Sequence, residues 1–130
     1  MRVLACTIPG TLARFRAVLP DAELYLVYTT DEALRLLRQH RFDLLMIGLR
    51  FDESRGLELP GRILAEGLAM PPFVGMRGAR TPAALSPQVF DLPMWALGAR
   101  DVIDFGAVPD TEAGNRHIAE RLARCVSPSA

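Results

Sequence analysis

The sequence feature that most constrains the fold is a continuous apolar run, Leu44 to Ile47, which ends at Gly48 and is followed by a polar loop up to Gly56. A run without polar alternation is typical of a parallel strand that is buried on both faces. In open α/β sheets, binding sites lie just beyond the carboxyl ends of the strands. We therefore expect residues 48 to 56 to border any functional site, although this loop contains no obvious catalytic group.

Four further segments have the length and composition of strands, and helical patterns lie between them. The strand segments are Arg2–Cys6, Glu23–Tyr28, Pro72–Met76 and Asp101–Phe105. The helical segments are Leu12–Leu19, the stretch after Thr29, Leu57–Leu68, Leu92–Leu97 and Thr111–Val126. We expect Thr29 or Thr30 to cap the second helix and Asp91 to cap the fourth. Most of the stretch from residue 78 to residue 93 is predicted to be a long loop.

Five strands that alternate with helices through short connections predict a parallel sheet with helices on both faces. The expected fold class is α/β, a flavodoxin-like three-layer sandwich with a five-stranded parallel sheet in the strand order 2-1-3-4-5. We expect one domain over residues 1 to 126, and a tail or the start of a linker over residues 127 to 130.

Charge and composition exclude several classes of function. The fifteen basic and fifteen acidic residues cancel, so the chain lacks the positive field of a nucleic-acid-binding protein and we expect no direct contact with DNA or RNA. No apolar run approaches the ~20 residues that span a bilayer, so no membrane association is expected. The two cysteines form no disulfide framework, which indicates a reducing, cytoplasmic location. Heavy use of Arg, Ala, Gly and Pro suggests a GC-rich bacterial genome.

Residues 29 to 64, TTDEALRLLRQHRFDLLMIGLRFDESRGLELPGRIL, resemble the second helix, third strand and third helix of response-regulator receiver (CheY-like) domains. Gly98 to Ile103 resembles the run into the fifth strand of that family. The resemblance covers nearly the whole chain and implies a role in two-component, or phosphorelay, signalling. In that family an aspartate after strand three accepts a phosphoryl group and an acidic pair after strand one holds Mg²⁺. A Ser or Thr after strand four and a lysine after strand five complete the site.

Each of these functional positions carries a different kind of residue in this sequence. The phosphoacceptor position falls on Gly48, the acidic pair on Thr7 and Ile8, the hydroxyl on Arg77 and the lysine on Phe105. A shifted alignment does not restore the site, because the chain contains no lysine and no acidic residue before Asp21. We therefore expect a degenerate pseudo-receiver that takes up no phosphoryl group, uses no metal or other cofactor and is not an enzyme.

Acidic residues elsewhere are poor substitutes for the lost site. Asp43 lies five strand residues before the phosphoacceptor position, roughly 16 Å away at ~3.3 Å per residue. Asp52 and Glu53 lie in the loop and would bind a cation weakly at most, since Mg²⁺ needs near-octahedral oxygen ligands. His117 and Glu120 have the spacing of two ligands on a helix, but no second histidine or cysteine is near. We predict no metal site.

Gly48 has two interpretations. The simpler one is that glycine permits a tight turn with positive φ. The other is that loss of the carboxylate lets Arg77 fold into the vacated pocket and pair with Asp52 or Glu53, which would lock one conformation.

Arg77 has a competing use in binding a small anion or nucleotide at the carboxyl edge of the sheet, together with Arg50 or Arg80. The glycines at positions 75 and 78 do not form either of the known phosphate-binding motifs. An anion- or nucleotide-binding module on the same fold is therefore the alternative function, since fold alone does not determine function.

Apolar residues around the fourth helix predict a protein interface. The candidate interface residues are Val89, Phe90, Met94, Trp95 and Val102. An aromatic side chain beside a methionine on a half-exposed helix is typical of an interaction hot spot, although core packing explains some of these side chains. We expect a protein partner, or a homodimer, to use the face formed by the fourth helix, the fifth strand and the fifth helix.

Overall fold

The computed structural model describes residues 1–78 and 89–126, and its five strands form one parallel sheet. The strands are β1 (Arg2–Cys6), β2 (Glu23–Val27), β3 (Leu44–Gly48), β4 (Phe73–Arg77) and β5 (Val102–Asp104). Their order is β2-β1-β3-β4-β5, and every neighbouring pair is parallel. The predicted fold class and strand order are confirmed.

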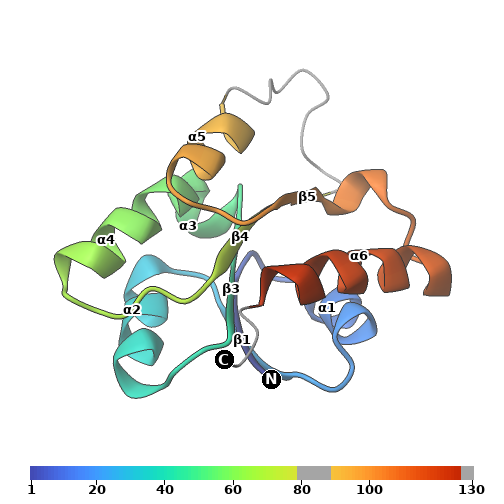
Figure 1. The fold of residues 1–130 in the computed structure, drawn as a ribbon, viewed down its shortest axis with the longest axis horizontal. Coiled ribbons are helices and arrows are strands. Elements are labelled where there is room, and N and C mark those ends of the chain that lie inside the picture. The colour runs from blue at the N-terminus through green and yellow to red at the C-terminus, as the bar shows by residue number, and fades with distance from the viewer. Residues whose placement is uncertain (79–88, 127–130) are drawn as a thin grey trace.

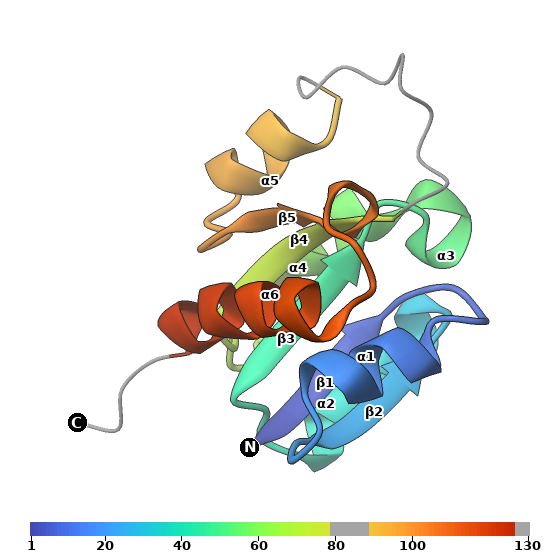
Figure 2. The same cartoon turned by 90° about the vertical axis from the view of Figure 1, so that its right-hand side faces the viewer.

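Helices cover both faces of the sheet and produce three layers (Figure 1). The helices are α1 (Leu12–Val18), α2 (Thr30–Gln39), α3 (Phe51–Ser54), α4 (Leu59–Ala65), α5 (Asp91–Ala96) and α6 (Glu112–Cys125), with 3₁₀ turns η1 (Gly56–Glu58) and η2 (Phe105–Ala107). Helices α1 and α6 pack together on one face, as Figure 2 shows, and α2, α4 and α5 cover the other. Over the described ranges, no helix is long and apolar enough to cross a bilayer.

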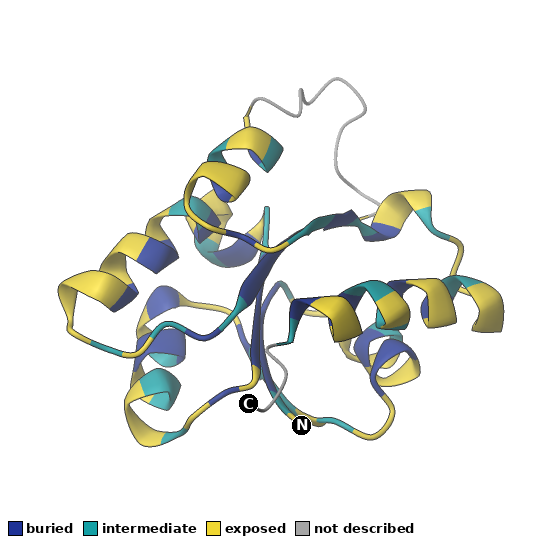
Figure 3. Cartoon of the chain, in the orientation of Figure 1, coloured by how far each residue is buried: buried dark blue, intermediate teal, exposed yellow. Residues whose placement is uncertain are grey.

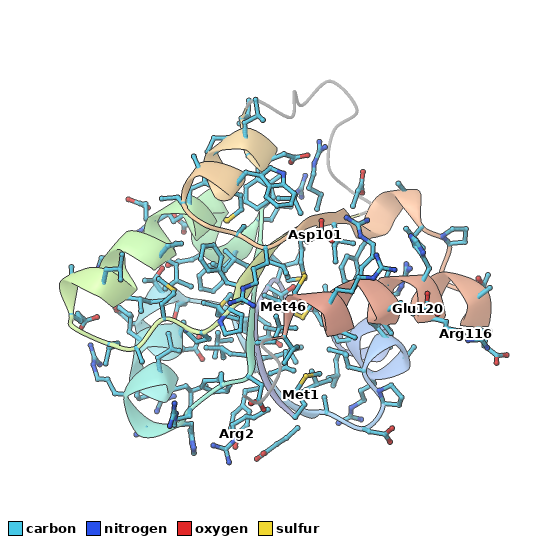
Figure 4. All side chains as sticks on the ribbon, viewed as in Figure 1. Met1, Arg2, Met46, Asp101, Arg116 and Glu120 are labelled. Atoms are coloured by element: carbon cyan, nitrogen blue, oxygen red, sulfur yellow. The ribbon has the colours of Figure 1, made fainter. Side chains whose placement is uncertain are left out.

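Strand β3 lies at the centre of the sheet and is buried on both faces, as its apolar run predicts. Leu44 and Met46 contribute to the core beneath α1 and α6, whereas Leu45 and Ile47 contribute to the core on the opposite face. All four side chains are completely buried, and each such burial stabilises the fold by about 1.5–3 kcal/mol. Figure 3 shows the buried strands between helices with exposed outer faces, and Figure 4 places Met46 in the middle.

Side chains at the helix starts confirm one predicted cap and correct another. The Glu32 backbone N–H donates to Thr29 Oγ1 (3.2 Å) at the start of α2, as predicted. Asp91 does not cap α5, because it is the first residue of the helix and Phe90 occupies the N-cap position without a side-chain hydrogen bond. The Asp91 carboxylate lies near Arg77 instead, with 3.6 Å between Oδ2 and Nη1.

Helix α4 is shorter than the segment predicted for it. The chain first forms η1, and the α-helix begins at Leu59 with Pro60 in its first turn, where a missing N–H costs nothing. Gly67 then adopts a φ of +70°, a left-handed conformation that ends the helix. Ten positions of the predicted loop, 79–88, and the predicted tail, 127–130, lie outside the described residues.

Candidate functional site

A cleft of about 330 Å³ lies at the carboxyl edge of the sheet. Its lining includes all five positions that the family resemblance assigns to the missing phosphorylation chemistry: Thr7, Ile8, Gly48, Arg77 and Phe105. These residues are far apart in the chain but meet because parallel strands all end at the same edge. The volume lies near the lower end of the range for small-molecule sites, about 300–1,000 Å³.

The turn after β1 forms one wall of the cleft and uses its hydroxyl groups internally. Thr7 Oγ1 lies 3.2 Å from Thr11 Oγ1, and the Thr11 hydroxyl donates to the Ile8 carbonyl oxygen (3.0 Å). Because a hydroxyl has a single proton, Thr7 must be the donor in its bond with Thr11. Both protons are thus used within the turn, and neither threonine offers the carboxylate that a divalent cation needs.

Gly48 ends β3 at the floor of the cleft, and the expected turn with positive φ is wrong at this position. A Cβ atom here would lie 3.2 Å from the Cys6 carbonyl oxygen. A Cβ atom on Gly56 would lie only 2.7 Å from the Gly48 carbonyl oxygen. The backbone around Gly48 is therefore closely packed, and no unusual φ angle requires glycine at this position.

Arg77 ends β4 and pairs with Asp91 across the cleft's rim rather than with the loop after β3. Its side chain is 13% exposed and that of Asp91 is 23% exposed. The predicted partners of Arg77, Asp52 and Glu53, are wrong. Asp52 is held at the start of α2, and the Glu53 carboxylate pairs with its neighbour Arg55 (3.0 Å).

Asp52 lies in an unusual turn after β3. Asp52, Glu53 and Ser54 have φ angles of 49°, 56° and 66°, in the left-handed region that costs about 1–2 kcal/mol for each non-glycine residue. The Asp52 carboxylate accepts hydrogen bonds from the Thr30 hydroxyl (2.7 Å) and backbone N–H (2.9 Å). Both bonds lower the pKa of Asp52, and the bond from the Thr30 hydroxyl has the larger effect. The turn therefore directs this carboxylate toward α2.

Arg14, on α1, is a cleft residue that the sequence pattern did not single out. Its Nε donates to Asn115 Oδ1 (2.7 Å) and its Nη2 to the Val108 carbonyl oxygen (2.8 Å). The guanidinium carbon lies 5.7 Å from the centre of the Phe105 ring, within cation–π range. Arg14 thus fixes the segment after β5, and no local signal could reveal this because its partners lie about a hundred residues later.

Charge in the cleft has one sign. Among the described lining residues three are arginines, Arg14, Arg50 and Arg77, and none is acidic. Arg80, a predicted anion ligand, lies outside the described residues. Within the part of the chain that is described, no three His, Cys, Asp or Glu side chains cluster as metal ligands do. The cleft is suited to anions.

The candidate interface residues separate into two groups. Phe90 and Met94 are buried in the core, where they pack over Gly75, so their assignment to a surface interface is wrong. Val102 is half-buried against the same core. Val89 and Trp95 are 52% and 47% exposed.

Two further apolar residues beside Val89 and Trp95 are exposed, and the sequence pattern did not single them out. Leu92 lies on α5 and Leu97 directly follows it. These four residues, Val89, Leu92, Trp95 and Leu97, make up what we call the α5 patch. An exposed apolar group of this kind is typical of a contact surface.

Comparisons by sequence find no match: no family model and no curated protein corresponds to the chain. Comparison by structure gives clear similarity to receiver proteins. A response regulator from Thermotoga maritima superimposes with a TM-score of 0.73 at 18% identity, covering 98% of each chain.

Two other solved structures are similar over comparable lengths. A response regulator from Hahella chejuensis has a TM-score of 0.68 at 22% identity, with 92% of each chain covered. The Vibrio cholerae chemotaxis protein CheY4 has a TM-score of 0.69 at 18% identity, covering 96% of this chain and 98% of its own. At such low identities the similarity establishes the fold, which is the CheY-like fold that the sequence predicts.

Proposed function

We propose that this chain, built on the CheY-like fold, is a receiver-like signalling module of the two-component type that takes up no phosphoryl group and acts by contact with another protein. Residues 1 to 126 would form the module and residues 127 to 130 a tail or linker. The observation that carries the proposal is the composition of the cleft: its described lining contains no carboxylate and no lysine at the edge where a receiver performs its chemistry.

Phosphoryl transfer depends on positioned groups that this cleft lacks. The reaction needs a nucleophile in line with the phosphorus atom, and cations that neutralise charge on the transferred group. Glycine at position 48 provides no nucleophile, and Thr7 and Ile8 provide no metal ligand. The nearest loop carboxylate, Asp52, is engaged by Thr30. A module without these parts would signal by presenting a surface.

The α5 patch is the surface that we assign to the partner. Its residues alternate along the chain with Phe90 and Met94, which pack over Gly75 of β4. A change at the end of β4 would therefore displace the patch. Trp95 is the side chain in the patch that is best suited to anchor a partner, since tryptophan is enriched among residues that contribute most to binding.

Chemical cross-linking in extract of the native cell tests this proposal. We expect Trp95→Ser to lose the cross-linked partner, whereas Leu64→Ser, which changes a leucine on α4 that is even more exposed than Trp95, retains it. Addition of acetyl phosphate and Mg²⁺ should leave the wild-type pattern unchanged. A pattern that responds to acetyl phosphate, or that survives Trp95→Ser and is lost in Leu64→Ser, contradicts the proposal.

A further inference from the structure

We propose that the cleft is a binding site for a small organic acid, whose carboxylate pairs with Arg77 and whose apolar body packs against the cleft walls. The inference extends the proposed function, because it gives the module an input in place of phosphorylation. It concerns the isolated chain, and it can be tested without any protein partner.

The charges around the cleft favour an anion. Three lining arginines face no acidic residue among the described lining residues. Two carboxylates outside the lining offset part of this charge: Asp91 lies 3.6 Å from Arg77, and the largely exposed Asp110 lies 3.7 Å from Arg14. Arg50 and Arg77 are also engaged in further contacts. The segments around this edge carry other carboxylates as well, including Asp104 at the end of β5, but none of them is among the described lining residues. A guanidinium fork matches a carboxylate geometrically.

The walls favour an organic acid over an inorganic anion. Leu49, Phe51, Met76 and Phe105 line the cleft together with Ile8. Inorganic phosphate would lose hydration against these side chains without gaining apolar contact, which costs free energy. An acid with an aryl or short alkyl body would bury apolar area at about 25 cal/mol per Å². A molecule of the size of benzoate suits a volume of about 330 Å³.

The ion pair between Arg77 and Asp91 would couple the site to α5. At 3.6 Å between Nη1 and Oδ2 the two groups are farther apart than in a good hydrogen bond. Asp91 Oδ1 is buried and has no hydrogen-bond partner among the described residues, so the carboxylate is incompletely satisfied. An incoming carboxylate would compete with Asp91 for Arg77. Because Asp91 is the first residue of α5, occupancy of the cleft would be transmitted to the α5 patch.

Titration of the ¹⁵N-labelled full chain with benzoate, followed by NMR, tests the site. We expect benzoate to shift the amide signals of Gly48, Arg77 and the first turn of α5. Benzamide, which has the same shape without the charge, should bind at least about tenfold more weakly, as expected for loss of one charge-assisted contact. Inorganic phosphate should also be weaker than benzoate. Equal binding of benzoate and benzamide, stronger binding of phosphate, or no shift at the cleft overturns the proposal.

Variants of the two ion-pair partners should act in opposite directions. Arg77→Gln removes the proposed ligand contact and should weaken benzoate binding by about tenfold or more. Asp91→Asn removes the competitor and should strengthen it several-fold. Arg116→Gln is the matched control, because this exposed arginine projects from α6 (Figure 4) and pairs with Glu112, and it should change nothing.

The two ion-pair variants also separate binding from stability. Both variants break the same ion pair. If that pair had a purely structural role, both variants would change benzoate affinity in the same direction. Changes in the same direction would overturn the assignment, even if one variant folds poorly. If benzoate fails to bind, the proposed function is unaffected, because it depends on the absence of phosphoryl uptake and not on benzoate. Uptake of a phosphoryl group by the wild-type chain would contradict the proposed function. Benzoate binding would still be decided by its own titration.

Discussion

Three consecutive residues after β3, Asp52 to Ser54, adopt left-handed conformations that cost free energy. The Asp52 carboxylate offsets part of that cost by accepting two hydrogen bonds from Thr30. Hydrogen bonds to charged groups contribute more to stability than bonds between neutral groups. Asp52 is close to solvent, so screening reduces this contribution. The residue nevertheless decides where the loop lies, because the two bonds tie it to the start of α2.

The lowered pKa of Asp52 predicts how stability changes with pH. An unfolded aspartate titrates near ~3.9. A group with a lower pKa in the folded state stabilises the fold above that value, and this contribution is lost as the pH falls through the folded pKa. We therefore expect Asp52→Asn to lower the melting temperature most at neutral pH, and the difference from wild type to shrink below about pH 4.

Melting curves recorded from pH 7 to pH 2 provide the measurement. Asp21→Asn is the control, because Asp21 is exposed and its carboxylate takes part in no hydrogen bond or ion pair among the described residues; its difference from wild type should stay small throughout. An Asp52→Asn difference that is constant with pH would contradict the role given to this carboxylate.

At the scale of elements, α5 is positioned by the absence of a side chain on β4. A Cβ atom on Gly75 would lie 2.7 Å from Met94 Cγ and 3.1 Å from Phe90 Cε2. Both of these side chains are fully buried, so they have little room to move. The short helix therefore sits directly on the strand, which is how Asp91 comes near Arg77.

Replacement of Gly75 by alanine should destabilise the fold by about 1–3 kcal/mol, the usual cost of overpacking a core. Gly61→Ala is the matched control. Gly61 lies in α4 with no atom within 4 Å of the added Cβ, and alanine there should stabilise by up to about 1 kcal/mol because it favours helix. Urea unfolding of both variants measures the difference. Equal stabilities would show that α5 does not pack on β4 in this way.

The elements could be predicted where their signal is local, and the contacts that join them could not. The apolar run of β3 and the Thr29 cap are patterns within a few residues. The bond from Thr30 to Asp52 spans 22 positions, and the partners of Arg14 lie farther still. Gly48 was misread for the same reason: its neighbour is a carbonyl on β1, which comes close only in the assembled sheet.

At the scale of the whole molecule, the parallel sheet gathers one residue from each strand end into the same cleft. The positions that the sequence placed at the strand ends therefore line one cleft, whereas the predicted partners of Arg77 were wrong. What the fold adds is the sign of the charge: the described lining carries arginines and no carboxylate. Such a lining supplies none of the carboxylate ligands that Mg²⁺ prefers, and its charged side chains are of the kind that pair with anions.

The most direct test of the account is incubation of the full chain with acetyl phosphate and Mg²⁺, followed by intact-protein mass spectrometry. A receiver that carries the complete set of phosphorylation residues, treated in the same way, provides the positive control. The account predicts an unchanged mass, because no carboxylate lies at the position of attack. A stoichiometric gain of one phosphoryl group, localised to Asp52 or any other residue at the cleft, would contradict it.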